Sequence, residues 1–166
     1  MDAWDRARDA RSYPGPWPVV AHPPCGPWGG LRHQSKHQDP ALAVQAVAAV
    51  RRWGGVLEHP SHSALWAHQG LPRPGSMFRD AWGGWSLQVD QVWFGHPARK
   101  RTWLYLVGVE PEEVTLEGVD KSRRPTHTVG GDGVARPNLW SEASRLTTWE
   151  FAEWLLRIAE GVSRPG

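Results

Sequence analysis

The sequence has one cysteine, Cys25, among its 166 residues. A single cysteine excludes an intrachain disulfide and fits a free thiol in a reducing compartment. Long apolar runs are absent as well, since none approaches the roughly 20 residues that cross a bilayer. The segment from Met1 to Arg11 is charged and lacks the apolar core of a signal peptide. We therefore expect a cytoplasmic protein without a membrane partner.

An excess of charge of one sign is also missing. The 19 lysines and arginines are nearly balanced by 17 acidic residues, and the net charge is +2. This balance neither requires nor excludes a nucleic-acid partner. Tryptophan is abundant instead, with 12 copies. Tryptophan can pack in a core or stack on bases, and we favour packing for any single one. The length suits one domain, residues 1–166.

The first half of the chain predicts a strand, a helix and a second strand. An apolar run over 18–22 ends at two prolines and predicts a buried strand. Residues 40–53 predict a buried helix, with Asp39 as its N-cap and Gly54-Gly55 ending it. A short apolar run over 56–58 predicts the next strand. This order indicates a βαβ unit with parallel strands.

Two reactive side chains follow these two strands. Cys25 comes shortly after the first strand, and Glu58 ends the second. Neighbouring parallel strands end at the same edge of a sheet, where ligands of open α/β sheets bind. The βαβ interpretation therefore places a thiol and a carboxylate in one crevice.

The second half predicts a hairpin and a final helix. Residues 61–69 suggest a short helix, and 85–94 and 101–109 read as two strands of a hairpin. Thr147-Thr148-Trp149-Glu150 is typical of a capping box. An apolar stripe with helical spacing follows, formed by Phe151, Trp154, Leu155 and Ile158. An α/β fold is the prediction.

Four segments, taken in order, resemble those of the cytosine-C5 DNA methyltransferases. They are Pro23-Pro24-Cys25 with Gly26-Pro27-Trp28-Gly29, Val56-Leu57-Glu58-His59-Pro60, the run from Phe94 to Gly108, and the run from Arg145 to Ala152. They are similar to that family's Pro-Cys loop, its Glu-Asn strand end with His59 in place of Asn, its Arg-x-Arg segment and its late Arg-x-Leu-Thr segment. The resemblance implies a reduced Rossmann-like methyltransferase sheet of about four or five mostly parallel strands, with a hairpin and flanking helices.

The chemistry explains why these residue types occur together. Carbon 5 of cytosine is a poor nucleophile, and a thiolate that adds to carbon 6 makes carbon 5 able to accept an electrophile. The resemblance implies that Cys25 is this nucleophile and that Glu58 hydrogen-bonds or protonates ring nitrogen N3. The latter role requires that burial raise the pKa of Glu58. A thiolate also needs a positive setting, and the resemblance implies that Arg99 and Arg101 hold the base and the thiolate region.

Substrate contacts are predicted in two places. Pro24 and Trp28 lie in the loop of the cysteine and are expected to contact the substrate. Residues 110–144 form a short irregular basic region in place of a target-recognition domain. Its cations Lys121, Arg123 and Arg124 are expected to grip phosphates, which positions a nucleic acid without specifying its sequence. We expect DNA or a cytosine nucleotide as the partner.

The resemblance implies S-adenosylmethionine as the methyl donor. A Gly-rich donor loop is not found before the first predicted strand, so cofactor-binding residues are not assigned. One hypothesis is C5 methylation with the donor held in an unusual way or by a second chain. Another uses the same cysteine addition for a different pyrimidine modification, such as deamination or hydroxymethylation. A third is a non-catalytic nucleic-acid-binding protein derived from this scaffold.

A zinc site is a further alternative from another class. His22, Cys25, His59 and His62 occur at the two predicted strand ends. Four such side chains can bind zinc tetrahedrally. We favour the site without a metal.

Overall fold

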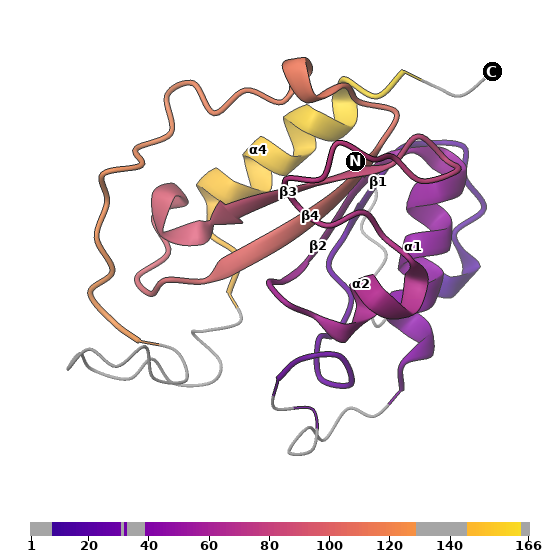
Figure 1. The fold of residues 1–166 in the computed structure, drawn as a ribbon, viewed down its shortest axis with the longest axis horizontal. Helices are drawn as coiled ribbons and strands as arrows, with labels where there is room; N and C mark the ends of the chain where they lie inside the picture. The colour runs from indigo at the N-terminus through magenta and orange to yellow at the C-terminus, as the bar shows by residue number, and fades with distance from the viewer. Residues whose placement is uncertain (1–7, 31, 33–38, 129–145, 164–166) are drawn as a thin grey trace.

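A four-stranded mixed sheet carries helices on both faces (Figure 1). The structure is a computed structural model that describes residues 8–30, 32, 39–128 and 146–163. The strands are β1 (Val19–Ala21), β2 (Gly55–Pro60), β3 (Trp85–Asp90) and β4 (Arg101–Val107), and the helices are α1 (Ala41–Trp53), α2 (Ala64–Gln69) and α4 (Trp149–Glu160). Short 3-10 turns cover Ala10–Ser12, Gln91–Phe94 and Pro111–Glu113. None of the described helices is long and apolar enough to cross a membrane. The predicted α/β class is confirmed.

The sheet has the strand order β1-β2-β4-β3. β1 and β2 are parallel and pair Val19 with Gly55, so the predicted βαβ unit is confirmed. β4 runs antiparallel to both β2 and β3. The prediction of mostly parallel strands is therefore wrong. The hairpin itself was predicted correctly, but its second strand, β4, lies between β2 and β3 and runs opposite to both, so that two of the three strand pairings are antiparallel.

The predicted helix over 40–53 is confirmed as α1. The helix begins at Ala41 and its N-cap is Pro40, so the predicted N-cap at Asp39 is one residue too early. Asp39 still accepts a hydrogen bond from the N–H of Ala41 at 2.9 Å. The following strand must approach β1 closely, and glycine permits this. Gly55 has a φ of +117°, and a Cβ at this position would lie 2.1 Å from the carbonyl oxygen of Val19. Glycine at 55 therefore allows both the turn and the pairing of β1 with β2.

Each face of the sheet buries its own apolar cluster. On one face, Leu57 and Trp103 pack with α1 and α2. On the other face, Val56 and Leu104 pack with α4, which lies across the sheet in Figure 1. Alternate residues of a strand point to opposite faces. Neighbouring residues of β2 therefore point into different layers of the protein.

The final helix buries the predicted stripe of Phe151, Trp154, Leu155 and Ile158. Thr148 caps α4 by accepting a hydrogen bond from the N–H of Phe151 at 3.4 Å. The predicted capping box is wrong, because Glu150 pairs with Arg123 instead of folding back on the helix start. Arg145, the first residue of the late segment, lies outside the described residues, as do residues 129–144 of the expected basic region.

Packing is the main role of the tryptophans in the described part of the chain. Trp28, Trp66, Trp85, Trp103 and Trp154 are buried. Most of their indole nitrogens have a partner: that of Trp85 donates to the carbonyl of Val109 at 2.7 Å, and that of Trp154 donates to the carbonyl of Thr115 at 2.9 Å. The latter bond fixes part of the irregular region after β4 against α4.

Candidate functional site

Cys25 lies in a loop that begins where β1 ends, and it is exposed. Pro23 and Pro24 stop the strand because they lack the N–H needed to continue the pairing. The carbonyl of Cys25 accepts two hydrogen bonds, from the N–H of Trp28 at 3.0 Å and from that of Gly29 at 2.8 Å. The backbone around the thiol is thus held in a turn while the residue itself stays accessible.

The cysteine loop is anchored to the neighbouring strand end. The Nδ1 of His22 lies 3.2 Å from an oxygen of Glu58 in β2. The carbonyl of Trp28 accepts a hydrogen bond from the N–H of Ala64 at the start of α2, at 3.0 Å. β1 and β2 are therefore neighbours, as the sequence predicted, although β2 continues past Glu58 to Pro60. His22, at the start of the segment that leads to Cys25, is the residue that contacts Glu58.

Glu58 is buried and its carboxylate is surrounded by donors. One oxygen accepts from Nδ1 of His22 at 3.2 Å. The other accepts from Nε2 of Gln91 at 3.0 Å and from the hydroxyl of Thr102 at 3.4 Å. Gln91 and Thr102 are themselves joined by a hydrogen bond of 2.9 Å. The network fixes the carboxylate from three sides.

The pKa of Glu58 departs from the expectation. Burial by itself raises this pKa, as predicted. The hydrogen bond from His22 and the electrostatic effects of Lys100, His22 and His59 act in the opposite direction and prevail, so the pKa of Glu58 lies below its usual value. The raised pKa that the proton-donating role requires is therefore not found. Glu58 is an ionised acceptor at neutral pH when no substrate is bound.

The two arginines expected to hold the base and the thiolate region have surroundings of their own. Arg99 forms an ion pair with Asp90 at 3.1 Å. Arg101 is exposed at the start of β4 and is adjacent to Thr102, which faces Glu58. Strand alternation turns Arg101 toward the opposite face. In the described part of the chain, no ion pair connects either arginine to Glu58.

Lys100 is the cation that acts on Glu58 instead. It lies two residues before Thr102, so the alternation that turns Arg101 away favours Lys100 on the face of Glu58. The sequence could have predicted this difference, because Arg99-Lys100-Arg101 leads directly into the strand. Alternation along a strand places Lys100 on the face opposite to that of its two arginine neighbours. Gln91 and Thr102 carried no comparable signal, because they reach Glu58 only through the strand pairing.

The predicted substrate-contacting residues have different surroundings. Pro24 is exposed next to the thiol. Trp28 is only 8% exposed and packs edge-on against His68, with ring centres 4.9 Å apart. Its ring belongs to the core in this conformation and would have to move to stack on a base. Pro24 is therefore better placed than Trp28 to contact a base at Cys25.

The predicted phosphate-gripping cations lie beyond the hairpin. Lys121 is positioned over the ring of Trp93, with Nζ 6.0 Å from its centre. Arg123 pairs with Glu150 at 2.7 Å, and Arg124 donates to the carbonyl of Ser122 at 2.8 Å. A shallow cavity of about 280 Å³ lies beside them, lined by Val92, Gly95, His96, Pro97, Arg123, Arg124 and Thr126. Phosphate binding here stays a prediction.

The alternative zinc site is not formed. Across the described ranges, no three His, Cys, Asp or Glu side chains come together in a metal-binding group. His22 is bonded to Glu58, and the ring of His62 lies against Trp103 with centres 4.9 Å apart. His59 points to the opposite face of the sheet from Glu58, by alternation along β2. The four side chains thus have separate environments.

His59 is fully buried, with an exposed fraction of 0%. Neither of its ring nitrogens has a hydrogen bond of regular geometry within the described residues, although the ring lies near the backbone of Pro24. Burial lowers the pKa of His59 to about 4, against the opposing effects of the Glu58 charge and the Pro24 backbone. The ring is therefore neutral in the folded protein at neutral pH.

The buried neutral His59 predicts a loss of stability in mild acid. The pKa of His59 falls from 6.5 to about 4 on folding, so between these values the unfolded chain binds a proton that the folded chain does not. The contribution of neutral His59 to the unfolding free energy is complete above pH 6.5 and is lost as the pH falls toward 4. Linkage gives a decrease of about 2 kcal/mol in unfolding free energy from pH 7.5 to pH 5. The lowered pKa of Glu58 acts in the same direction at lower pH.

Urea unfolding at the two pH values measures this effect. A His59→Gln variant should lose about 2 kcal/mol less than the natural chain over the same interval. His68→Gln is the matched control, because His68 is exposed on α2. Equal pH dependence of His59→Gln and the natural chain would show that His59 is not the responsible group.

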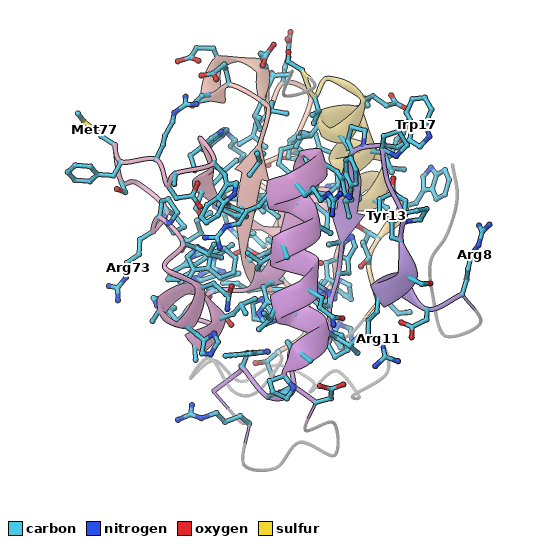
Figure 2. The ribbon with its side chains drawn as sticks, turned by 90° about the vertical axis from the view of Figure 1, so that its right-hand side faces the viewer. Arg8, Arg11, Tyr13, Trp17, Arg73 and Met77 are labelled. Atoms are coloured by element: carbon cyan, nitrogen blue, oxygen red, sulfur yellow. The ribbon has the colours of Figure 1, made fainter. Side chains whose placement is uncertain are left out.

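A long groove follows the outer edge of β1 and ends at the cysteine loop. Its volume is about 1800 Å³, and it reaches His22, Pro23 and Pro24. α1 and α4 form its walls with Leu42, Gln45, Ala46, Ala49, Ala152, Leu156, Ala159 and Glu160. Arg8, Arg11, Tyr13 and Trp17, which also line it, lie on one side of the molecule, and Arg73 and Met77 lie on the other (Figure 2). No sequence pattern predicted this groove, because its walls come from segments near both ends of the chain.

The floor of this groove is an open strand edge. β1 is the first strand in the sheet order, and among the described residues it pairs only with β2. Val19 donates its N–H to Gly54 at 3.0 Å. The backbone alternates along a strand, so the N–H and C=O of Val20 point outward to the groove. The alanine side chains of the walls leave space, and the N–H and C=O of Val20 face the groove. This strand edge is therefore suited to a polar ligand or to a further strand.

The chain matches no protein-family model, no curated protein and no solved structure. The case for its function therefore rests on the site and on the resemblance of its four segments.

Proposed function

We propose that this protein modifies cytosine at carbon 5, in DNA or in a nucleotide, by covalent addition of Cys25 to carbon 6. The observation that supports it is the pairing of an exposed thiol loop with a buried carboxylate, through the 3.2 Å contact of His22 with Glu58. A nucleophile and an acid are the two groups that this reaction needs, and here they come from the loop after β1 and from the neighbouring strand β2.

The surroundings of each group suit its role. Cys25 is exposed on a loop with a fixed backbone, so a flat base can approach the thiol without a rearrangement of the core. Glu58 is held by Gln91 and Thr102, which limits the movement of its carboxylate. A carboxylate can accept a hydrogen bond from the amino group of cytosine. The same carboxyl group then protonates N3 as negative charge develops on the ring.

Solvent exchange at carbon 5 tests the addition without a methyl donor. After Cys25 adds to carbon 6, carbon 5 can take a deuteron from D2O and lose its own proton before the thiolate leaves. We expect the C5–H signal of deoxycytidine monophosphate or of a single-stranded oligonucleotide to disappear with time in proton NMR. An unchanged signal for both substrates would contradict covalent addition and favour a non-catalytic binding protein. Formation of uracil would favour the deamination alternative.

We propose that S-adenosylmethionine, or the second chain that carries it, occupies the groove beside β1. When bound there, the donor would supply the methyl group to the activated carbon 5. The volume of about 1800 Å³ exceeds the roughly 300–1,000 Å³ of ordinary ligand sites. Alanines of both helices leave the walls open, and His22 to Pro24 connect the groove to the thiol loop. The groove therefore fits either occupant.

Calorimetry with S-adenosylmethionine tests direct binding of the donor. We expect binding by the natural chain and a loss of at least about tenfold in affinity for Ala152→Trp, whose ring would fill the groove. Ala48→Trp, on the exposed side of α1 and not among the groove residues, is the matched control. Absence of binding by the natural chain would contradict a donor site in this chain alone and favour the second chain.

A further inference from the structure

The proposed reaction has an unmet requirement for a proton. Protonation of N3 needs a carboxylic acid, whereas the hydrogen bond and charges around Glu58 keep it ionised at rest. A proton must therefore reach Glu58 during the attack. The described residues that hydrogen-bond to Glu58 are His22, Gln91 and Thr102. Of these, only histidine changes protonation near neutral pH.

We propose that His22 supplies this proton: its imidazolium gives the Nδ1 proton to Glu58 as Glu58 protonates N3. This inference rests on the proposed function and adds a residue that acts through Glu58. The geometry is direct, because Nδ1 lies 3.2 Å from the carboxylate oxygen. The side chain of His22 is 33% exposed, against 10% for Glu58, so the histidine can take up a new proton from water.

The proton and the electron pairs balance in each step. The thiolate of Cys25 forms the S–C6 bond, the C5–C6 double bond shifts to C4–C5, and the C4–N3 pair moves to N3. N3 takes a proton from the carboxyl group of Glu58, and Glu58 takes one from Nδ1 of His22, which becomes neutral. When the thiolate leaves, the proton returns along the same path. No oxidant, reductant or metal takes part.

The surroundings of the pair contain few competing groups. Lys100 and His59 are the other charged or titratable groups that act on Glu58, and His59 is neutral at neutral pH. Gln91 and Thr102 can donate hydrogen bonds but do not change charge. α4 contributes apolar side chains, including Phe151 and Leu155, to the cluster on this face. The His22–Glu58 pair is therefore the proton-exchanging unit of the site.

The test compares C5–H exchange across pH for the natural chain and His22→Asn. Asparagine keeps a donor near the position of Nδ1 but cannot carry a proton. We expect a loss on the order of ten- to a hundredfold at pH 7, and a smaller loss at pH 5, where water protonates Glu58 directly. Added imidazole should partly restore exchange by His22→Ala without accelerating the natural chain.

Four results would overturn the inference. Normal exchange by His22→Asn, or a loss of the same factor at every pH, would show that His22 only holds Glu58 in place. No exchange by the natural chain would refute the proposed function together with the inference. If the variants do not fold, proton NMR of the natural chain decides: a strongly deshielded imidazole proton that disappears in Glu58→Gln supports the shared proton, and its absence contradicts it.

Discussion

Cys25→Ser should abolish the exchange of the cytosine C5 proton, with a loss on the order of 10³-fold or more. A serine hydroxyl remains protonated at neutral pH and is a far weaker nucleophile than a thiolate. Because Cys25 is exposed, the substitution should change the unfolding free energy by no more than about 0.5 kcal/mol. The loss would therefore be chemical and not structural.

The measurement is the exchange rate by NMR, together with the mass of the protein after reaction with an oligonucleotide that carries a reactive cytosine analogue. A covalent adduct on the natural chain should be missing from Cys25→Ser. Gly30→Ser is the matched control in the same loop, because a Cβ at Gly30 would meet no atom within 4 Å. Retention of exchange by Cys25→Ser would exclude the thiol as the nucleophile.

Glu58→Gln should reduce the exchange rate by about 10²- to 10⁴-fold, the usual contribution of general acid catalysis. The amide is nearly isosteric and its oxygen can still accept hydrogen bonds from Gln91 and Thr102. It cannot deliver a proton to N3, and its NH2 group would face the Nδ1 of His22, which lies 3.2 Å from the native carboxylate. Loss of that hydrogen bond should cost about 1–3 kcal/mol of stability.

Exchange rates at saturating substrate separate the chemical loss from weakened binding. Glu153→Gln is the matched control, because Glu153 is exposed on α4. This substitution removes the same charge from the protein. If the exchange rate of Glu58→Gln lies within threefold of that of the natural chain, the two activation free energies differ by no more than about 0.6 kcal/mol. That result would exclude Glu58 from the mechanism. Circular dichroism and urea unfolding show whether both variants are folded.

The ionised state of Glu58 changes how its role is understood. A carboxyl group that is neutral at rest would need only to approach N3, but this carboxylate must first gain a proton. The proton requirement couples the catalytic group to His22, which the sequence offered only as a strand end or a zinc ligand. The activity of the site should accordingly depend on both members of the pair.

Local patterns predicted the elements that build the site. The prolines after β1 and the glycines that end α1 are short-range signals that held. The start of α1 and the end of β2 were each predicted too early, because the N-cap is Pro40 and β2 continues to Pro60. They were sufficient to infer that β1 and β2 are adjacent and parallel, with Cys25 after β1 and Glu58 in β2. Such features depend on backbone preferences and on neighbours within a few residues, so they can be read from the order of the residues alone.

Tertiary structure decided the partners of those two groups. The insertion of β4 between β2 and β3 brings Thr102 and Gln91 to Glu58 and makes the sheet mixed. Strand alternation then favours Lys100 over Arg101 on the face of Glu58, and it sends His59 to the opposite core. The sequence by itself thus determined which reactive groups lie at the strand ends. Their charge state depended on which distant strands pair, because hydrogen bonds and burial act through space and not along the chain.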